Sequence, residues 1–462
     1  MICRFFISVS VLLVTTAAMP DARRLHADVV TGWNEIASQV LIDNVDLQNP
    51  GMSSRTMAMM NLAIHDSLAM TGSFGTTGSV GQTFYQYNGI SAATTASGTA
   101  AAASAAYTVL RSIYPDQQTS LEAKYSTAIA GIASGTARDS GIALGQSIGQ
   151  SIVSRRANDG YNTMSQYQPT NLPGRWQPDP LNPSQEAWGP NWGNVQTFRI
   201  ASVAPFLPSA PPPLSSQQYA TSFNEVKELG AIDSATRTQE QTDIGKFWAY
   251  DRVGMGTPIR LYNQALRNIA DIKNNTTEDN AKLFAKASVA MADAGIVAWN
   301  AKFEHDLWRP VTGIRQADTD GNPDTIADPN WTPLGAPELN DPDFTPPFPT
   351  YISGHATFGG ALFASIENFY GTDSITFGLS SDELDGEIRM FDSLSEAMAE
   401  NGRSRVYLGI HWDYDDTEGQ LVGIDVANFI SSSAFVTAVP EPGSFAFGVA
   451  AVAWWMRRRR PA

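Results

Sequence analysis

The stretch Phe348-Pro-Thr-Tyr-Ile-Ser-Gly-His-Ala-Thr-Phe-Gly-Gly360 contains the strongest local signals in this chain of 462 residues. A proline-rich loop runs into Ser353, a favourable N-cap residue, and the apolar run over 356–366 predicts a buried helix. Gly354 and His355 then lie in the first turn of that helix. Unpaired N–H groups and the positive end of the helix dipole favour an anion there, and a histidine beside the anion can exchange protons with it.

The composition is that of a globular protein with a sizeable core. Hydrophobic residues make up 43% of the chain and charged residues 16%. The net charge of −16 argues against nucleic acid and against an anionic membrane surface as partners. Cys3, the single cysteine, lies in the segment that we expect to be removed, so the mature protein has no disulfide.

Both ends of the chain carry targeting signals. Residues 1–27 have a basic tip and a short apolar run, as in a secretory signal peptide. Residues 438–462 contain Pro-Glu-Pro, an apolar segment and four arginines, and resemble a PEP-CTERM sorting signal. This resemblance implies export in a Gram-negative bacterium, to the periplasm, the cell envelope or the outside. It also implies transient contact with an exosortase and the inner membrane.

The pattern of apolar residues predicts an all-α fold with two helical halves, 28–203 and 214–433, separated by the proline-rich stretch 205–213. Strand signals are nearly absent. The long segment 161–214 is too apolar for a linker and is predicted to be an ordered loop over the helices, and 306–349 is predicted to be a second loop. Helices are predicted at 33–41, 55–69, 91–113, 116–132, 137–156, 216–229, 235–249, 258–272, 278–305, 354–370, 384–400 and 417–432.

Cations and histidines gather in three segments of the second half. These are Lys302-Phe-Glu-His-Asp-Leu-Trp-Arg309-Pro310, Ser353-Gly354-His355 and Ser404-Arg405-Val-Tyr-Leu-Gly-Ile-His411-Trp-Asp-Tyr-Asp415. Lys302 and Arg309 are seven residues apart, so one continuous helix would point both the same way, with Pro310 ending it. Three cations, a hydroxyl, a free N–H and two histidines suit a tetrahedral oxyanion with several charged oxygens.

The three segments together resemble the signature of vanadium-dependent haloperoxidases, which type 2 phosphatidic acid phosphatases and bacterial acid phosphatases share. Flanking sequence extends the resemblance over about 235–426, to the fungal chloroperoxidase branch. It implies two helical bundles, vanadate as cofactor and no haem. It also implies hydrogen peroxide and halide as substrates, hypohalous acid as product and an organic acceptor that the residues do not identify.

The resemblance also implies which residues hold the cofactor. Lys302, Arg309 and Arg405 would bind the equatorial oxygens of vanadate. Ser353 and the Gly354 N–H would add hydrogen bonds to the same oxygens. Together these five residues would form a cage around the anion.

The resemblance further implies that the two histidines act as the metal ligand and as the acid–base group. His411 would bond directly to vanadium, and Asp415 would orient its imidazole. His355 would be the acid–base group for peroxide exchange, and Lys302 would polarise the bound peroxide, which vanadium(V) activates as a Lewis acid without changing its own oxidation state.

Three further positions are carried over from the chloroperoxidase branch. Asp251 resembles the residue that pairs with the arginine corresponding to Arg405. Trp299 and Phe348 resemble residues that line a halide pocket, and Phe348 stands where other branches have a second histidine.

Two other functions use the same sequence features. In an acid phosphatase His411 would be the nucleophile and His355 would protonate the leaving group. In a non-catalytic surface protein the C-terminal signal would be the main purpose of the chain, but an intact set of buried charges is costly to keep without use.

Overall fold

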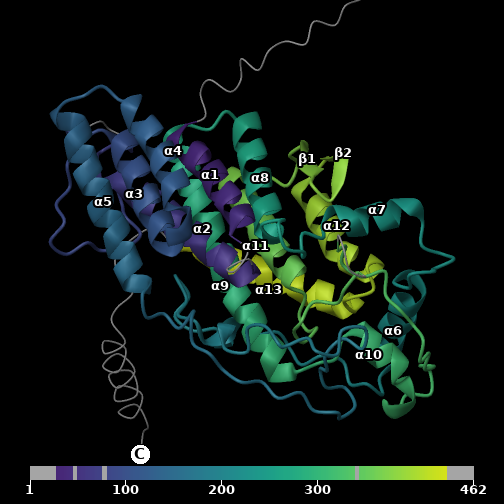
Figure 1. Ribbon diagram of the computed structural model, residues 1–462. Coiled ribbons are helices and arrows are strands. Elements are labelled where there is room, and N and C mark those ends of the chain that lie inside the picture. The colour runs from purple at the N-terminus through teal and green to yellow at the C-terminus, as the bar shows by residue number, and fades with distance from the viewer. Residues whose placement is uncertain (1–27, 45–48, 75–80, 339–342, 434–462) are drawn as a thin grey trace, which may run out of the picture.

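The computed structural model describes residues 28–44, 49–74, 81–338 and 343–433, and the regular secondary structure of this part of the chain is almost entirely helical (Figure 1). The predicted all-α class is confirmed. The predicted signal peptide and sorting segment lie outside the described residues. Within the described ranges, no helix is both long and apolar enough to span a membrane.

The first bundle is built from α2 (Pro50–Met70), α3 (Gly98–Ile113) and α5 (Thr136–Arg156), which pack on one another. Helices α1 (Val29–Asp43) and α4 (Gln118–Ala130) flank them. A Cβ at Gly145 of α5 would clash with the backbone of Ala101 in α3. The alanine-rich sequence of α3 therefore serves close helix packing, which small side chains permit.

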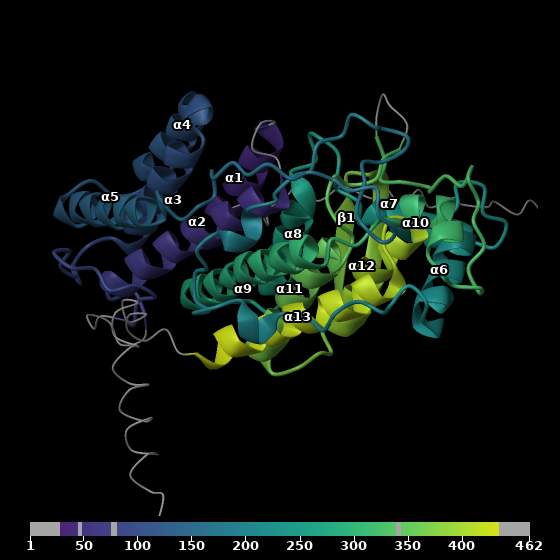
Figure 2. The same ribbon diagram turned by 90° about the horizontal axis from the view of Figure 1, so that it is seen from below.

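Helix α9 (Thr277–His305) joins the two halves, because it contacts α2 on one side and α11 (Gly354–Tyr370) and α13 (Asp413–Ser432) on the other. Figure 2 shows α9, α11 and α13 running side by side. A capping box between Thr276 and Asp279 starts α9. The second half is completed by α6 (Gln217–Leu229), α7 (Gln239–Phe247), α8 (Thr257–Ile272), α10 (Pro310–Arg315) and α12 (Leu394–Tyr407).

The helix predicted at 384–400 is wrong in its first half. Strand β1 (Phe377–Ser381) pairs antiparallel with β2 (Leu384–Phe391), and α12 begins only at Leu394. Burial alternates along β1, as in a strand with one buried face. Gly386 has a φ of 80°, which a helix does not allow.

The expectation that one helix carries Lys302 and Arg309 is also wrong. Helix α9 ends at His305, and Asp306 adopts a left-handed conformation with φ of 53°. Arg309 is the N-cap residue of α10, and Pro310 starts this helix rather than ending α9. The predicted loop 306–349 therefore contains a short helix.

The segment between α5 and α6 is an ordered loop that runs over the second half, as predicted. Its Trp176 N–H donates to the carbonyl of Asp306 at 2.9 Å, and its Trp188 N–H donates to the carbonyl of Pro347 at 2.8 Å. A side-chain bond from Gln185 to the carbonyl of Thr345, at 2.7 Å, adds to these contacts. Residues of the first half of the chain thus lie against the stretch that precedes α11.

Candidate active site

The N-terminus of α11 has the geometry that its sequence predicts. Ser353 is the N-cap, and its Oγ accepts from the Ala356 N–H at 3.3 Å. Gly354 and His355 are in the first turn, where backbone N–H groups have no partner within the helix. Two buried side chains from α8 and α12 hold this turn in place, since Asn401 and Tyr262 both donate to the carbonyl of His355, at 2.9 and 3.2 Å.

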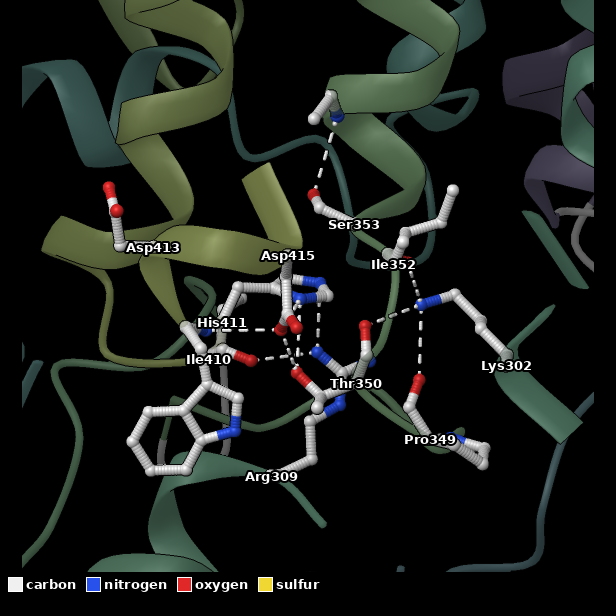
Figure 3. Close-up of polar contacts among 12 residues, drawn as sticks. Lys302, Arg309, Pro349, Thr350, Ile352, Ser353, Ile410, His411, Asp413 and Asp415 are labelled. Carbon is white, nitrogen blue, oxygen red and sulfur yellow. Dashed lines mark hydrogen bonds and ion pairs between the residues drawn. The ribbon is translucent and has the colours of Figure 1, made fainter. Parts of the chain in front are cut away.

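Lys302 lies beneath the loop that enters α11. Its fully buried ammonium group donates to the carbonyls of Pro349, Thr350 and Ile352 at 3.0, 2.9 and 2.5 Å (Figure 3). Burial, and then the charge of Arg309, hold the pKa of Lys302 well below its usual range. All three N–H donors are used by carbonyls, so Lys302 supplies positive charge here, and a direct bond to an anion would require exchange of one carbonyl.

Arg309 connects this loop to the third segment. Its Nε donates to the Phe348 carbonyl at 2.9 Å, and its Nη1 donates to the Ile410 carbonyl at 2.8 Å and to His411 Nε2 at 2.9 Å. Burial lowers the pKa of Arg309 to about 9. Nη2 is buried and has no hydrogen-bond partner among the described residues.

His411 is held by Asp415 and Thr350, which face its Nδ1 (Figure 3). Asp415 Oδ2 lies 2.9 Å from Nδ1, and Thr350 Oγ1 lies 3.1 Å from it. The Thr350 hydroxyl and the Trp412 N–H both donate to the same carboxylate oxygen. Because the carboxylate accepts at Nδ1 and Arg309 donates at Nε2, the neutral ring carries its proton on Nδ1 and a lone pair on Nε2.

The charges around His411 keep this ring neutral. Burial, followed by the charges of Arg309, Lys302 and Arg405, holds the pKa of His411 well below its usual range. Burial also raises the pKa of Asp415 to about 7, against the opposing hydrogen bond from Thr350.

Arg405 is fully buried and pairs with Asp251, with 2.5 Å between Nη2 and Oδ2. Its Nε and Nη1 are buried and have no hydrogen-bond partner among the described residues. With Nη2 of Arg309, the site therefore contains three guanidinium donors without an acceptor. Buried donors of this kind are costly, so the site is chemically incomplete without an anion.

His355 is oriented by backbone carbonyls. Its Nε2 lies 2.8 Å from the Ala249 carbonyl and 3.1 Å from the Trp248 carbonyl. Carbonyls only accept, so Nε2 carries the proton and Nδ1 of the neutral ring is a proton acceptor. Burial, and then the charge of Arg405, lowers the pKa of His355 to about 4.

A cavity of about 640 Å³ opens onto this cluster. Seven of the predicted site residues line it: Asp251, Trp299, Phe348, Gly354, His355, Arg405 and His411. Trp299 and Phe348 pack with their ring centroids 5.0 Å apart. Lys302, Arg309, Ser353 and Asp415 lie behind the lining, where hydrogen bonds connect Lys302, Arg309 and Asp415 to residues around the cavity. The structure thus brings all the predicted site residues to one place.

Thr350, Asn401 and Tyr262 are site residues that the sequence analysis missed. Thr350 contacts Lys302 through its carbonyl and both Asp415 and His411 through its hydroxyl. Its place in the Pro-Thr-Tyr-Ile stretch, next to the Ser-Gly-His segment, was the only available signal. Asn401 and Tyr262 carry no local signal, because only packing brings their elements against α11.

We expect His355 to titrate near pH 4, since burial lowers its pKa to about this value from 6.5. Between these two values the unfolded chain binds a proton that the folded chain does not. Lowering the pH through this window should therefore reduce the free energy of unfolding, by up to roughly 3 kcal/mol from this group. Nitrogen-15 NMR of histidine-labelled protein measures the midpoint, and a midpoint above pH 6 would contradict the assignment.

Residues 282–437 match the family described as the VCPO second helical-bundle domain. The chain is 37% identical over 292 residues to vanadium chloroperoxidase from Curvularia inaequalis, a match that covers 51% of this chain and 47% of that protein. The match thus spans about half the length of this curated relative.

Solved structures extend the likeness to the first half of the chain. The first bacterial vanadium-dependent iodoperoxidase superposes with a TM-score of 0.72 at 25% identity, covering 87% of this chain and 95% of the other. A bacterial vanadium-dependent chloroperoxidase superposes with a TM-score of 0.62 at 18% identity, covering 86% of this chain and 94% of the other. These matches show that the chain shares the helical fold of vanadium-dependent haloperoxidases and that its second half is similar in sequence to one of them.

Proposed function

We propose that this chain is a vanadium-dependent haloperoxidase that oxidises halide with hydrogen peroxide to hypohalous acid. The observation that carries this proposal is the set of three guanidinium donors on Arg309 and Arg405 that have no acceptor among the described residues. They lie beside a neutral histidine with its lone pair on Nε2. The names of the relatives, which are chloroperoxidases and an iodoperoxidase, support the same conclusion.

The residues fit vanadate. Arg309 Nη2, Arg405 Nε and Arg405 Nη1 would donate to its oxygens, with the N–H groups at the start of α11 as further donors. His411 would be the ligand through Nε2, because Nδ1 faces Asp415. An anion bonded to Nε2 would replace the hydrogen bond that Arg309 Nη1 now donates to this atom.

Vanadate(V) in this cage would supply Lewis-acid activation of hydrogen peroxide. The protein groups would perform the proton transfers. His355, with its proton on Nε2 held by two carbonyls, would accept a proton from peroxide on Nδ1 and return it to the leaving oxygen. Lys302, Arg309 and Arg405 would offset the negative charge of the oxygens.

Trp299 and Phe348 would form the apolar side of the halide site. Both line the cavity next to His355 and His411. The Lys302 ammonium lies 5.1 Å from the centre of the Phe348 ring and 5.6 Å from that of Trp299. A halide beside these rings would lose water, which would make it a stronger nucleophile, and the buried cation would hold it at the site.

Addition of orthovanadate to anion-free protein should switch on halide oxidation, and excess phosphate should suppress it, since both anions compete for one cage. Bromide-dependent bromination of a phenol dye with peroxide measures this gain. If vanadate has no effect and the protein instead releases phosphate rapidly from p-nitrophenyl phosphate, the acid phosphatase with His411 as nucleophile is the correct function.

Thr350→Val should weaken vanadate binding about 10- to 100-fold, the usual effect of removing a partner that orients a ligating histidine. Valine keeps the shape of threonine but removes the hydroxyl that donates to Asp415. Thr350→Ser restores the hydroxyl and should bind nearly as well as the parent protein. Titration calorimetry with vanadate measures the affinities, and equal affinities for Thr350→Val and the parent would exclude this role.

We also propose that the protein is exported and sorted. The basic and apolar pattern of residues 1–27 and the Pro-Glu-Pro, apolar and arginine pattern of 438–462 support this proposal. A diffusible oxidant is also safer outside the cytoplasm. Mass spectrometry of protein from its native host should find neither 1–18 nor 457–460, and an intact arginine tail on mature protein would argue against exosortase processing.

A further inference from the structure

The cavity above His355 and His411 is far larger than the substrates of the proposed reaction require. Its volume is about 640 Å³. A peroxide or a halide occupies roughly one or two water volumes, each about 30 Å³. Cavities of roughly 300–1,000 Å³ with apolar walls are typical of sites for organic ligands. Most of this space is therefore available to a ligand other than the inorganic substrates.

The wall of this cavity is aromatic. Trp188 lies edge-on to Trp299, with ring centroids 5.2 Å apart, and 6.3 Å from Phe348. Trp188 belongs to the loop between α5 and α6, outside the range 282–437 that matches the second helical-bundle domain. It is half-buried and lines the cavity, so part of its ring faces the cavity. Such a ring offers a face on which a flat molecule can stack.

This wall is built into the fold. The Trp188 N–H donates to the Pro347 carbonyl at 2.8 Å, and Gln185 donates to the Thr345 carbonyl at 2.7 Å. The loop that carries Trp188 is thus tied to the stretch that leads into α11. The ring is held at a defined place relative to His355, as a specific ligand site requires.

The charges at the mouth favour a neutral ligand. Among the lining residues, Arg252 is paired with Glu383 at 2.8 Å, and the Asp179 carboxylate accepts from the backbone of Leu181 and Thr345 at 2.8 and 3.2 Å. The other charged residues that line the cavity outside the predicted site, Glu338 and Asp343, are both acidic. An anionic acceptor would meet repulsion there before it reached the cage.

We propose that this cavity binds a neutral, electron-rich aromatic acceptor of the phenol or indole class, stacked on Trp188, and that halogenation takes place there. This proposal rests on the proposed function. Halide, hydrogen peroxide and a proton give hypohalous acid and water. The hypohalous acid then transfers its halogen to a ring carbon, so that a carbon–halogen bond forms, the oxygen–halogen bond breaks, and the ring proton leaves with the hydroxide as water.

Trp188→Leu and Trp188→Phe test the stacking. Leucine keeps the wall apolar but removes the ring, and should raise the KM for 4-methylphenol about three- to tenfold, the range that one aromatic contact supplies. Phenylalanine keeps a ring and should stay within about twofold. Triiodide formation from iodide and peroxide needs no organic acceptor and should be unchanged in both variants.

The product ratio provides a second measurement. With a phenol that has two reactive ring positions, the parent enzyme should give a ratio of brominated isomers that differs from that of reagent hypobromous acid. Trp188→Leu should move this ratio to the reagent value. A reagent-like ratio in the parent enzyme, with an unchanged KM in Trp188→Leu, would overturn the proposal, because the oxidant would then react after leaving the protein.

Binding without turnover separates this inference from the proposed function. Saturation-transfer NMR of 4-methylphenol with the full chain, without vanadate or peroxide, should show contact in the parent and much less in Trp188→Leu. Equal transfer in both would overturn the proposal whatever reaction the protein catalyses, whereas absence of triiodide formation in the vanadate-loaded parent would overturn the proposed function alone.

If Trp188→Leu does not fold, Asn182→Trp provides a second test, because Asn182 is an exposed residue of the cavity lining. The larger side chain should fill the mouth and raise the KM for 4-methylphenol without lowering triiodide formation. An unchanged KM in that variant would overturn the proposal.

Discussion

His411→Ala should abolish halide oxidation and lower vanadate affinity more than 100-fold, beyond the usual effect of losing a residue that only orients a ligand. The nitrogen of His411 that can bind vanadium is Nε2, because Nδ1 faces Asp415 and Thr350. Lys302, Arg309 and Arg405 remain in this variant, so phosphate, which needs no bond to the histidine, should still bind. Calorimetric titration with vanadate and with phosphate measures both affinities.

His355→Ala is the matched comparison, since it removes a histidine from the same cavity without removing the ligand. Turnover should fall about 10²–10⁴-fold, the usual worth of a positioned acid–base group, while vanadate affinity changes less than about tenfold. His305→Gln, at a half-buried histidine outside the cavity lining, should change neither. The role assignment is wrong if His355→Ala loses vanadate as completely as His411→Ala, or if His411→Ala stays active.

Asp251→Asn should lower the free energy of unfolding by about 3 kcal/mol, because removal of one partner leaves a buried charge uncompensated. Arg405 has a fully buried side chain and Asp251 is 13% exposed. Two of the three guanidinium nitrogens of Arg405 already have no acceptor among the described residues. Urea denaturation of the variant and the parent measures the difference.

Phosphate should reduce the difference in free energy of unfolding between Asp251→Asn and the parent. An anion in the cage would compensate the charge of Arg405 in place of the lost carboxylate, and it stabilises only the folded state. Asp382→Asn is the control. It removes an ion pair with Arg260 at a carboxylate that is 51% exposed, and should cost less than about 1 kcal/mol with or without phosphate. A gap between Asp251→Asn and the parent that phosphate leaves unchanged would show that Arg405 does not face the anion.

Local sequence predicted the start of α11 well. An N-cap depends on the residue itself and on the next three positions, so Ser353, Gly354 and His355 could be placed on the first turn from sequence. The same reasoning failed at Pro310. A proline after an apparent helix can end that helix or begin the next one, and the left-handed conformation of Asp306 decides between them.

The hairpin of β1 and β2 shows a different reason for failure. A sequence such as Leu-Asp-Gly-Glu-Ile-Arg-Met-Phe, at 384–391, fits a helix or a strand when taken alone. The strand is selected by its partner β1 and by the packing of Phe391 on Phe377 and Trp248, with ring centroids 5.4 and 5.8 Å away. Local preference is weak enough for such contacts to override it.

The amino-acid sequence by itself determined the helical class of this protein and the set of cations and histidines on which the proposed function rests, because helix periodicity and side-chain chemistry are local properties. Only the tertiary structure decided the protonation and direction of each group. Carbonyls at 248 and 249 place the proton of His355, Thr350 and Asp415 place that of His411, and the loop carrying Trp188 supplies the cavity wall. Thr350 and His411 are 61 positions apart in the sequence, and Ala249 and His355 are 106 apart. The direction and the burial of such hydrogen bonds are defined only once packing has brought the residues together.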